Sequence, residues 1–217
     1  MITSIIFDVD DLMVNTSQLH FAANDLVLKD HGIAAGSVPG EFNRKIYGMR
    51  MREIMELLIA QFNLDADVDT FLKKRNQYFM TLVRKGVGPM PGLEVLLKNV
   101  KRWKRKSALA TSGIQEYADE VLKQLNLENF FEAIVTGDQV KNPKPAPDCF
   151  LLAAKRLRSK PNACAVLEDS THGITAAKKA GMLAIAVENS VHPAHQDLSM
   201  ADILVHRLDE ITKKMLQ

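Results

Sequence analysis

The chain has 217 residues and a formal net charge of +2, and 47% of its residues are hydrophobic and 25% charged. This composition is typical of a globular protein with a substantial core, and so small a charge does not by itself indicate a nucleic-acid or membrane partner. The two cysteines, Cys149 and Cys164, are too few for a disulfide framework and lack metal-site spacing, which fits a reducing cytosol.

The first predicted element is a buried strand over residues 3–8, whose apolar run ends at Asp8. This run is too short for a signal peptide or a membrane span, so we expect a cytoplasmic protein without a membrane partner. A helix follows, with Asn15 as its expected N-cap and Gly32 as its terminator. Helical patterns continue over 52–62 and 67–85 with no strand between them, which predicts an all-helical subdomain.

Glycines and prolines between residues 86 and 92 end the helical pattern, and strands then alternate with helices. Helices are expected at 92–103, 114–126, 148–158, 173–180 and the C-terminus, and strands at 107–111, 133–136, 163–168, 183–187 and 202–205. This alternation predicts right-handed crossovers and a parallel sheet. We therefore expect an α/β fold: a doubly wound, Rossmann-like core over 1–15 and 87–217, with an all-helical cap domain inserted over 16–86.

Four polar clusters each follow, or nearly follow, a predicted strand, where ligand sites of open α/β sheets lie. They are Asp8 with Asp10, Thr111-Ser112-Gly113, Lys144 between prolines, and Glu168 with Asp169. Asp8 and Asp10 are spaced i and i+2, so strand geometry puts both carboxylates on one side. The prolines beside Lys144 restrict the backbone and suit a lysine that must be aimed.

Together the clusters predict a phosphoryl-transfer site that uses Mg²⁺. Carboxylates, water and phosphate oxygens are the ligands that octahedral Mg²⁺ prefers. Lysine, hydroxyl and backbone N–H donors neutralise the oxygens of the transferring group. We expect Asp8 to be the nucleophile that forms an aspartyl-phosphate and Asp10 to be its partner in proton transfer. Each cluster alone is weak evidence, so the prediction depends on finding all four in this order.

The chain resembles hydrolases of the haloacid dehalogenase superfamily that carry a helical cap of the β-phosphoglucomutase and phosphoglycolate-phosphatase type. The resemblance covers essentially the whole length and rests on four stretches. They are Phe-Asp-Val-Asp at 7–10, Leu-Ala-Thr-Ser-Gly at 109–113, Lys-Pro-Ala-Pro-Asp at 144–148 and Leu-Glu-Asp-Ser-Thr-His-Gly-Ile at 167–174. Haloacid dehalogenases proper lack the second aspartate, so Asp10 favours phosphoryl over haloalkyl chemistry.

For the metal site, the resemblance implies that Asp8 is both nucleophile and Mg²⁺ ligand. Asp10 is then the general acid/base, and its backbone carbonyl reaches the metal. Asp169 is a further ligand, supported by Glu168. Asp11 departs from the family pattern, which usually has glycine there. If the position needs a positive φ, aspartate is among the less costly replacements, at about 1 kcal/mol.

For the phosphoryl group, the resemblance implies hydrogen bonds from Thr111 and the amide of Ser112, with Lys144 pairing with both nucleophile and phosphate.

The cap sets the substrate, and its candidate residues are His20, Arg50, Arg52, Arg75 and Asn76. His20 stands where related enzymes place a histidine near the acid/base, although a helix-surface histidine explains it equally well. In the mutases a cap arginine grips a second phosphate, but here a methionine holds the closest register, between Arg50 and Arg52. Arg75-Asn76 is similar to a mutase Lys-Asn pair.

We therefore expect a phosphatase of small phosphate monoesters, such as sugar phosphates, with a β-phosphoglucomutase-type mutase as the alternative. The basic run between Lys98 and Lys106 could hold nucleic acid, but cations at a helix C-terminus are explained more simply as solvated. The expected partner is a small phosphorylated metabolite rather than nucleic acid, and the expected assembly is a monomer or weak homodimer.

Overall fold

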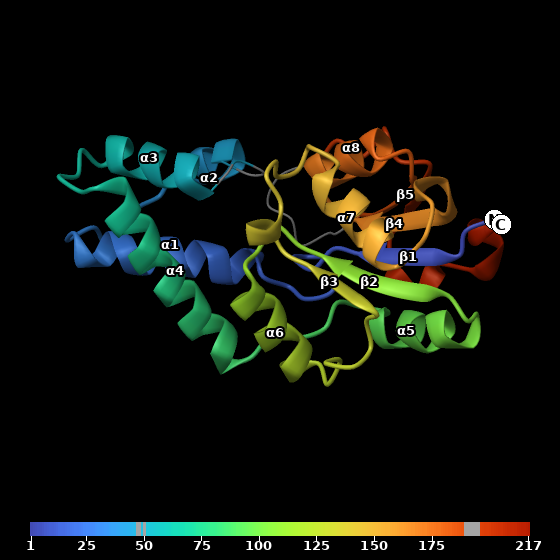
Figure 1. Cartoon of the computed structure of the whole chain (residues 1–217). Coiled ribbons are helices and arrows are strands. Elements are labelled where there is room, and N and C mark those ends of the chain that lie inside the picture. Colours follow the sequence, from blue (N-terminus) through green and yellow to red (C-terminus); the bar gives the residue numbers. More distant parts are fainter. Residues whose placement is uncertain (47–48, 50, 189–195) are drawn as a thin grey trace. The chain divides into compact units, whose positions relative to one another are not determined.

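The computed structural model describes residues 1–46, 49, 51–188 and 196–217 (Figure 1). The chain forms two compact units. Among the described residues, one comprises Met1–Asn15, 87–188 and Gln196–Gln217, and the other lies within Thr16–Gly86. Within the described ranges, no helix combines the length and the apolar character that crossing a bilayer would require.

The first unit is built on a six-stranded sheet in the order β3-β2-β1-β4-β5-β6. Its strands are β1 (Ser4–Phe7), β2 (Lys106–Ala110), β3 (Ala133–Val135), β4 (Cys164–Glu168), β5 (Leu183–Val187) and β6 (Ile203–Val205). All neighbours pair in parallel, and Phe7 lies in register with Leu109 on one side and Leu167 on the other. The central strands are buried on both faces, which explains why they read as unbroken apolar runs. The predicted parallel α/β sheet is confirmed.

Helices cover both faces of this sheet. Figure 1 shows α7 (Asp148–Arg156) and α8 (Thr171–Lys179) on one face, and α5 (Leu93–Arg102) and α6 (Gln115–Gln124) on the other. The buried cluster under α7 and α8 is rich in alanine, and these small side chains let the helices approach the strands closely: Ala108, Ala110, Ala153, Ala154, Ala176, Ala177, Ala184 and Ala186. Close packing here fixes where the carboxyl ends of β1 and β4 stand.

Two sequence predictions about element ends are wrong. The predicted terminal helix is replaced by two short 3₁₀ turns, Leu208–Glu210 and Lys213–Leu216. Thr212 caps the second turn with extended backbone angles of φ −114° and ψ 159°, which breaks any continuous helix. Asn15 is not an N-cap, because α1 begins at Ser17 and Thr16 occupies the cap position without a side-chain cap bond. Two further 3₁₀ turns lie at Gly137–Gln139 and Pro161–Ala163.

The second unit contains only helices among its described residues: α1 (Ser17–Asp30), α2 (Gly40–Ile46), α3 (Met51–Gln61) and α4 (Val68–Lys85). They enclose a separate apolar cluster of Val27, Leu28, Ile46, Ile54, Met55, Leu58 and Phe71. Asp67 caps α4 by accepting a hydrogen bond from the Thr70 N–H at 2.9 Å. The short α2 was not predicted.

Candidate active site

Asp8 stands at the carboxyl end of β1, in the middle of the sheet. Its N–H donates to the carbonyl of Leu167 at 3.1 Å, so the ladder between β1 and β4 extends to this residue. The loop after it turns back tightly, because the N–H groups of Met13 and Val14 both donate to the carbonyl of Val9. Val9, Met13 and Val14 are completely buried, so the loop that carries the acidic residues is anchored by apolar side chains.

Asp10 and Asp11 lie in this anchored loop. The N–H of Asp11 donates to the Val14 carbonyl at 2.8 Å, and Asp11 has a φ of 55°. This is the left-handed conformation in which glycine is least strained, which explains why the family pattern usually has glycine at this position. Asp11 is also buried, which adds a carboxylate to an already acidic region.

Lys144 brings three parts of the chain together. Its Nζ donates to Oδ1 of Asp8 at 2.5 Å, to Oε1 of Glu168 at 2.7 Å and to the carbonyl of Ala110 at 3.3 Å. The ammonium also lies 4.8 Å from the centre of the Phe150 ring. The Lys144–Pro145 peptide bond is cis. The structure therefore places the ends of β1, β2 and β4 around one buried cation, as the order of the motifs predicts.

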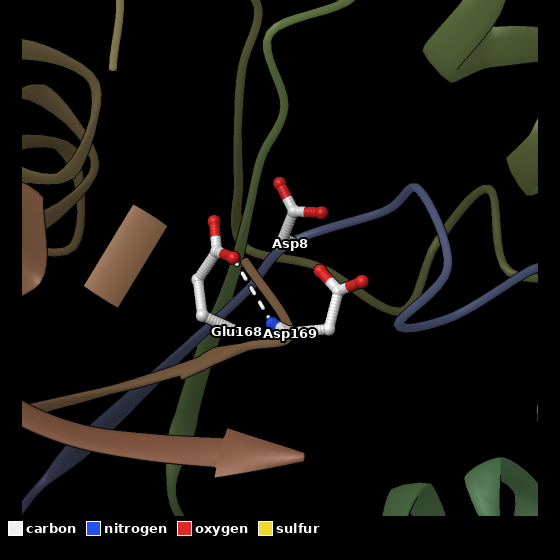
Figure 2. A group of neighbouring side chains, drawn as sticks. All are labelled: Asp8, Glu168 and Asp169. Atoms are coloured by element: carbon white, nitrogen blue, oxygen red, sulfur yellow. Dashed lines mark hydrogen bonds between the residues drawn. The ribbon is translucent and has the colours of Figure 1, made fainter. Parts of the chain in front are cut away.

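Glu168 is the last residue of β4 and Asp169 follows it, and their carboxyl groups gather with that of Asp8, as Figure 2 shows. Oε2 of Glu168 accepts from the Asp169 N–H at 3.0 Å, the Ser170 N–H at 3.0 Å and the Ser170 hydroxyl at 2.9 Å. With the Lys144 bond on Oε1, both of its oxygens are engaged. Its carboxylate also rests directly on Gly173 of α8, where a Cβ would fall 1.7 Å from Oε1. Glu168 is thus held rigidly.

Burial dominates the electrostatics of these groups. It raises the pKa of Asp8 well above its usual value, with Glu168 and Asp169 adding to the shift and Lys144 opposing it. Burial likewise raises the pKa of Asp169, and Glu168 and Asp11 act in the same direction. Burial disfavours the charged form of Lys144, but Asp8 and Glu168 outweigh this and raise its pKa. A fixed cation therefore faces carboxylates that still repel one another.

A metal ion would relieve this repulsion, and the donor set fits one. Asp8, Glu168 and Asp169 are all buried, and each offers a carboxylate oxygen within 4.8 Å of the others. Clustered carboxylate oxygens are what hard cations such as Mg²⁺ prefer, and no thiol or imidazole is part of the group.

Thr111 and Ser112 follow β2 beside these acids. The Thr111 N–H donates to the Val135 carbonyl at 3.0 Å, and its hydroxyl accepts from the Gly113 N–H at 2.9 Å. Thr111 is completely buried, whereas Ser112 is exposed. The Gly137 N–H donates to the Gly113 carbonyl at 2.7 Å, and a Cβ at Gly137 would collide with the Ser112 carbonyl at 2.3 Å. The loop is therefore fixed by glycine contacts.

One residue of this region was missed by the sequence analysis. Tyr117 of α6 donates a hydrogen bond from its hydroxyl to Oδ1 of Asp10 at 2.6 Å. The helix predicted over 114–126 includes Tyr117 but assigns it no role. No pattern indicates its partner, which lies 107 positions away.

The predicted cap residues fall into three groups. His20, Arg75 and Asn76 lie together: Nη2 of Arg75 donates to Nδ1 of His20 at 2.6 Å, and Nη1 donates to Oδ1 of Asn76 at 3.3 Å. Arg75 is only 2% exposed. Arg52 is on the surface and pairs with Asp69 and Glu56. Arg50 lies outside the described residues.

Comparison with known proteins places these features in context. The family model for haloacid dehalogenase-like hydrolases matches residues 5–187, which contain all four motif stretches. A phosphorylated carbohydrates phosphatase from Thermotoga maritima is 35% identical over 179 residues, or 82% of each chain. A fructose-1-phosphate phosphatase from Escherichia coli is 32% identical over 84% of this chain and 95% of its own. A crystal structure of β-phosphoglucomutase from Clostridium difficile has a TM-score of 0.81 at 26% identity and covers 100% of this chain and 96% of that one.

Proposed function

Because the chain belongs to the family of haloacid dehalogenase-like hydrolases, we propose that it is a Mg²⁺-dependent phosphatase of small phosphorylated carbohydrates. The relatives from Thermotoga maritima and Escherichia coli are named for activity on phosphates of this kind. The observation that carries the proposal is the buried contact between Lys144 and Asp8, 2.5 Å long, with Glu168 and Asp169 beside it. An ion pair that only stabilised the fold could lie on the surface, so the burial of this pair among carboxylates supports a functional role.

In the first step, a carboxylate oxygen of Asp8 attacks the phosphorus of the substrate. The bond from phosphorus to the sugar oxygen breaks, and an aspartyl-phosphate forms. Lys144, the Thr111 hydroxyl and the amide of Ser112 stabilise the charge on the phosphoryl oxygens. The ammonium is already aimed, because Glu168 and the Ala110 carbonyl hold it in place.

Asp10 moves the proton in both steps. It gives a proton to the departing sugar oxygen in the first step. In the second step it takes a proton from the water that attacks the phosphorus of the aspartyl-phosphate. The bond to Asp8 then breaks, which releases inorganic phosphate and restores both carboxyl groups.

The residues that would hold Mg²⁺ are Asp8 and Asp169, and Glu168 belongs to the same group of carboxylates. The family resemblance adds the backbone carbonyl of Asp10 as a further ligand. Since the oxygens of Glu168 already accept four hydrogen bonds, we assign it mainly to supporting Lys144 and the loop after β4. When bound, the cation supplies charge neutralisation on the phosphoryl oxygens.

A mutase of the β-phosphoglucomutase type is the second candidate, favoured by the full-length structural match to that enzyme. A mutase needs a positively charged side chain that can bind the second phosphate of a bisphosphorylated sugar. Arg52 pairs with Asp69 and Glu56, and Arg75 bonds to Asn24, His20 and Asn76, so both arginines have partners within their own unit. This engagement favours the phosphatase.

The test is phosphate release from a panel of sugar phosphates with Mg²⁺, run beside glucose 6-phosphate formation from β-glucose 1-phosphate. We expect phosphate release from at least one sugar phosphate, with loss of more than about 10³-fold in Asp8→Asn because the nucleophile is removed. Asp119→Asn, an exposed position on α6, is the matched control and should retain activity. Sustained isomerisation with little phosphate released would refute the phosphatase, and full turnover by Asp8→Asn would refute the mechanism.

A further inference from the structure

Tyr117 is placed by the core rather than by any catalytic motif. It is 2% exposed and lies on the face of α6 that also buries Ala118, Val121 and Leu122. Its ring packs on Gly113, where a Cβ would lie 2.5 Å from Cδ1 and 3.2 Å from Cε1. A side chain larger than hydrogen at Gly113 would therefore displace the ring. The position of the phenol is fixed from two sides.

The hydroxyl at the end of this fixed ring meets Asp10, which is half-buried in the loop after β1. The oxygen–oxygen distance of 2.6 Å is typical of charge-assisted hydrogen bonds between hydroxyl groups and carboxylates, which are stronger than neutral ones. Asp10 itself sits in a loop whose neighbours Val9, Leu12 and Met13 are buried. Two well-packed segments thus meet at the hydrogen bond between Tyr117 and Asp10.

We propose that Tyr117 is a positioning residue that orients the carboxyl group of Asp10 for proton transfer to the leaving oxygen. This inference rests on the proposed phosphatase function and assigns a role that the four motifs do not contain. It is a property of the contact between α6 and the loop after β1, both in the same compact unit.

The chemistry follows from the hydrogen count of a phenol. The hydroxyl carries one hydrogen, and donating it to Oδ1 of Asp10 keeps that oxygen an acceptor. The proton that Asp10 transfers must then be carried on Oδ2. Without the phenol hydroxyl, Oδ1 loses the donor that keeps it an acceptor, and the proton is held on either oxygen.

The step that depends on this orientation is the first one. As the bond from phosphorus to the sugar oxygen breaks, the proton on Oδ2 of Asp10 passes to that oxygen, and the new bond forms between phosphorus and Asp8. A sugar alkoxide is a poor leaving group and needs this proton. A p-nitrophenolate is stable as an anion and leaves without it, so an aryl phosphate bypasses the contribution of an oriented acid.

The experiment compares kcat/KM for two substrates in wild type and Tyr117→Phe. The substrates are p-nitrophenyl phosphate and the sugar phosphate that the panel above shows to be cleaved fastest. Phenylalanine keeps the ring that packs on Gly113 and removes only the hydroxyl. We expect kcat/KM for the sugar phosphate to fall roughly tenfold, a fraction of what a general acid contributes, and that for p-nitrophenyl phosphate to fall less than about twofold.

Tyr78→Phe is the matched control, because Tyr78 also donates its hydroxyl to an aspartate, Asp30, at 2.8–2.9 Å, but in the helical unit. Its substrate ratio should equal that of the wild type. The ratio of the two kcat/KM values does not depend on the fraction of folded enzyme, so partial loss of stability leaves the test valid. Equal losses on both substrates in Tyr117→Phe, or the same change of ratio in Tyr78→Phe, would overturn the proposal. Turnover by Asp8→Asn in the same assay would instead refute the underlying function.

Discussion

Gly173→Ala is expected to displace the carboxylate of Glu168 and so to destabilise the protein. The missing Cβ at this position would lie 1.7 Å from Oε1, 1.8 Å from Cδ and 2.2 Å from Oε2 of Glu168. Real carbon–oxygen contacts are longer than these distances by more than an ångström, so the carboxylate must move. Gly173 lies inside α8 and Glu168 at the end of β4, and both are buried, so neither can move without a cost in packing or hydrogen bonds.

The magnitude follows from the bonds that Glu168 would lose. It accepts hydrogen bonds from Lys144, the Asp169 N–H, and the N–H and hydroxyl of Ser170. Loss of two bonds to this charged group costs about 3–6 kcal/mol at about 1.5–3 kcal/mol each. Replacing glycine by alanine inside a helix returns about 1 kcal/mol. The net loss is about 2–5 kcal/mol, or a fall in Tm on the order of 10 °C for a chain of this size.

The assay is thermal unfolding of the metal-free protein, with phosphate release measured in parallel. Gly88→Ala is the matched control, because a Cβ there meets nothing within 4 Å and its φ is not positive. It should change Tm by no more than about 1 °C, in line with substitutions away from packed features. If Gly173→Ala unfolds within about 1 °C of the wild type, the carboxylate of Glu168 is not held where the structure has it, and the reasoning fails.

Two further predictions concern the acidic residues. Because the pKa of Asp169 is raised, its contribution to stability is complete below the usual pKa near 3.8 and is lost as pH rises through the folded-state pKa. In EDTA, the Tm of Asp169→Asn should therefore rise relative to that of the wild type as pH increases from 4 to 8. Asp202 has a lowered pKa, so its contribution to stability is complete above its usual value near 3.8 and is lost as pH falls below it. The Tm difference between Asp202→Asn and wild type should therefore change mainly below pH 4, and a rise like that of Asp169→Asn between pH 4 and 8 would contradict the electrostatic argument. Asp11→Gly should stabilise the metal-free protein by about 1 kcal/mol by relieving the left-handed strain, and should weaken Mg²⁺ binding measured by calorimetry. Asp11→Asn should weaken binding without that gain, and unchanged Mg²⁺ affinity in both variants would exclude an electrostatic role for Asp11.

The parallel sheet and the grouping of the acids were predictable because each depends on local order in the chain. Short unbroken apolar runs that alternate with helical patterns are typical of strands buried on both faces, and parallel strands put their carboxyl ends at one edge. Asp8, Lys144 and Glu168 come together for that reason. Asp11 could be assigned a positive φ from the glycine that the family usually has, and its φ of 55° confirms this.

What could not be predicted depends on contacts between distant segments. The bond from Tyr117 to Asp10 joins positions 107 residues apart, and helical periodicity gives only the face on which Tyr117 lies. The sequence suggests Arg75 as a substrate residue of the cap, yet its side chain is buried, and Asn24 and His20 on α1 accept its hydrogens. The strand order is also invisible locally, since alternation of strands and helices fixes parallel pairing but not which strands are neighbours.

The geometry of the site implies that its stability and its chemistry are coupled. Asp8 and Asp169 are held where burial and mutual repulsion raise their pKa values, which costs folding free energy at neutral pH in the absence of a cation. The alanine-rich packing of α7 and α8 against the sheet resists relaxation of that arrangement. A ligand that binds only the folded state adds stability according to its concentration and affinity. Mg²⁺ should therefore stabilise the first unit directly, and by more at pH 8 than at pH 5, because protons compete with the cation for the same carboxylates.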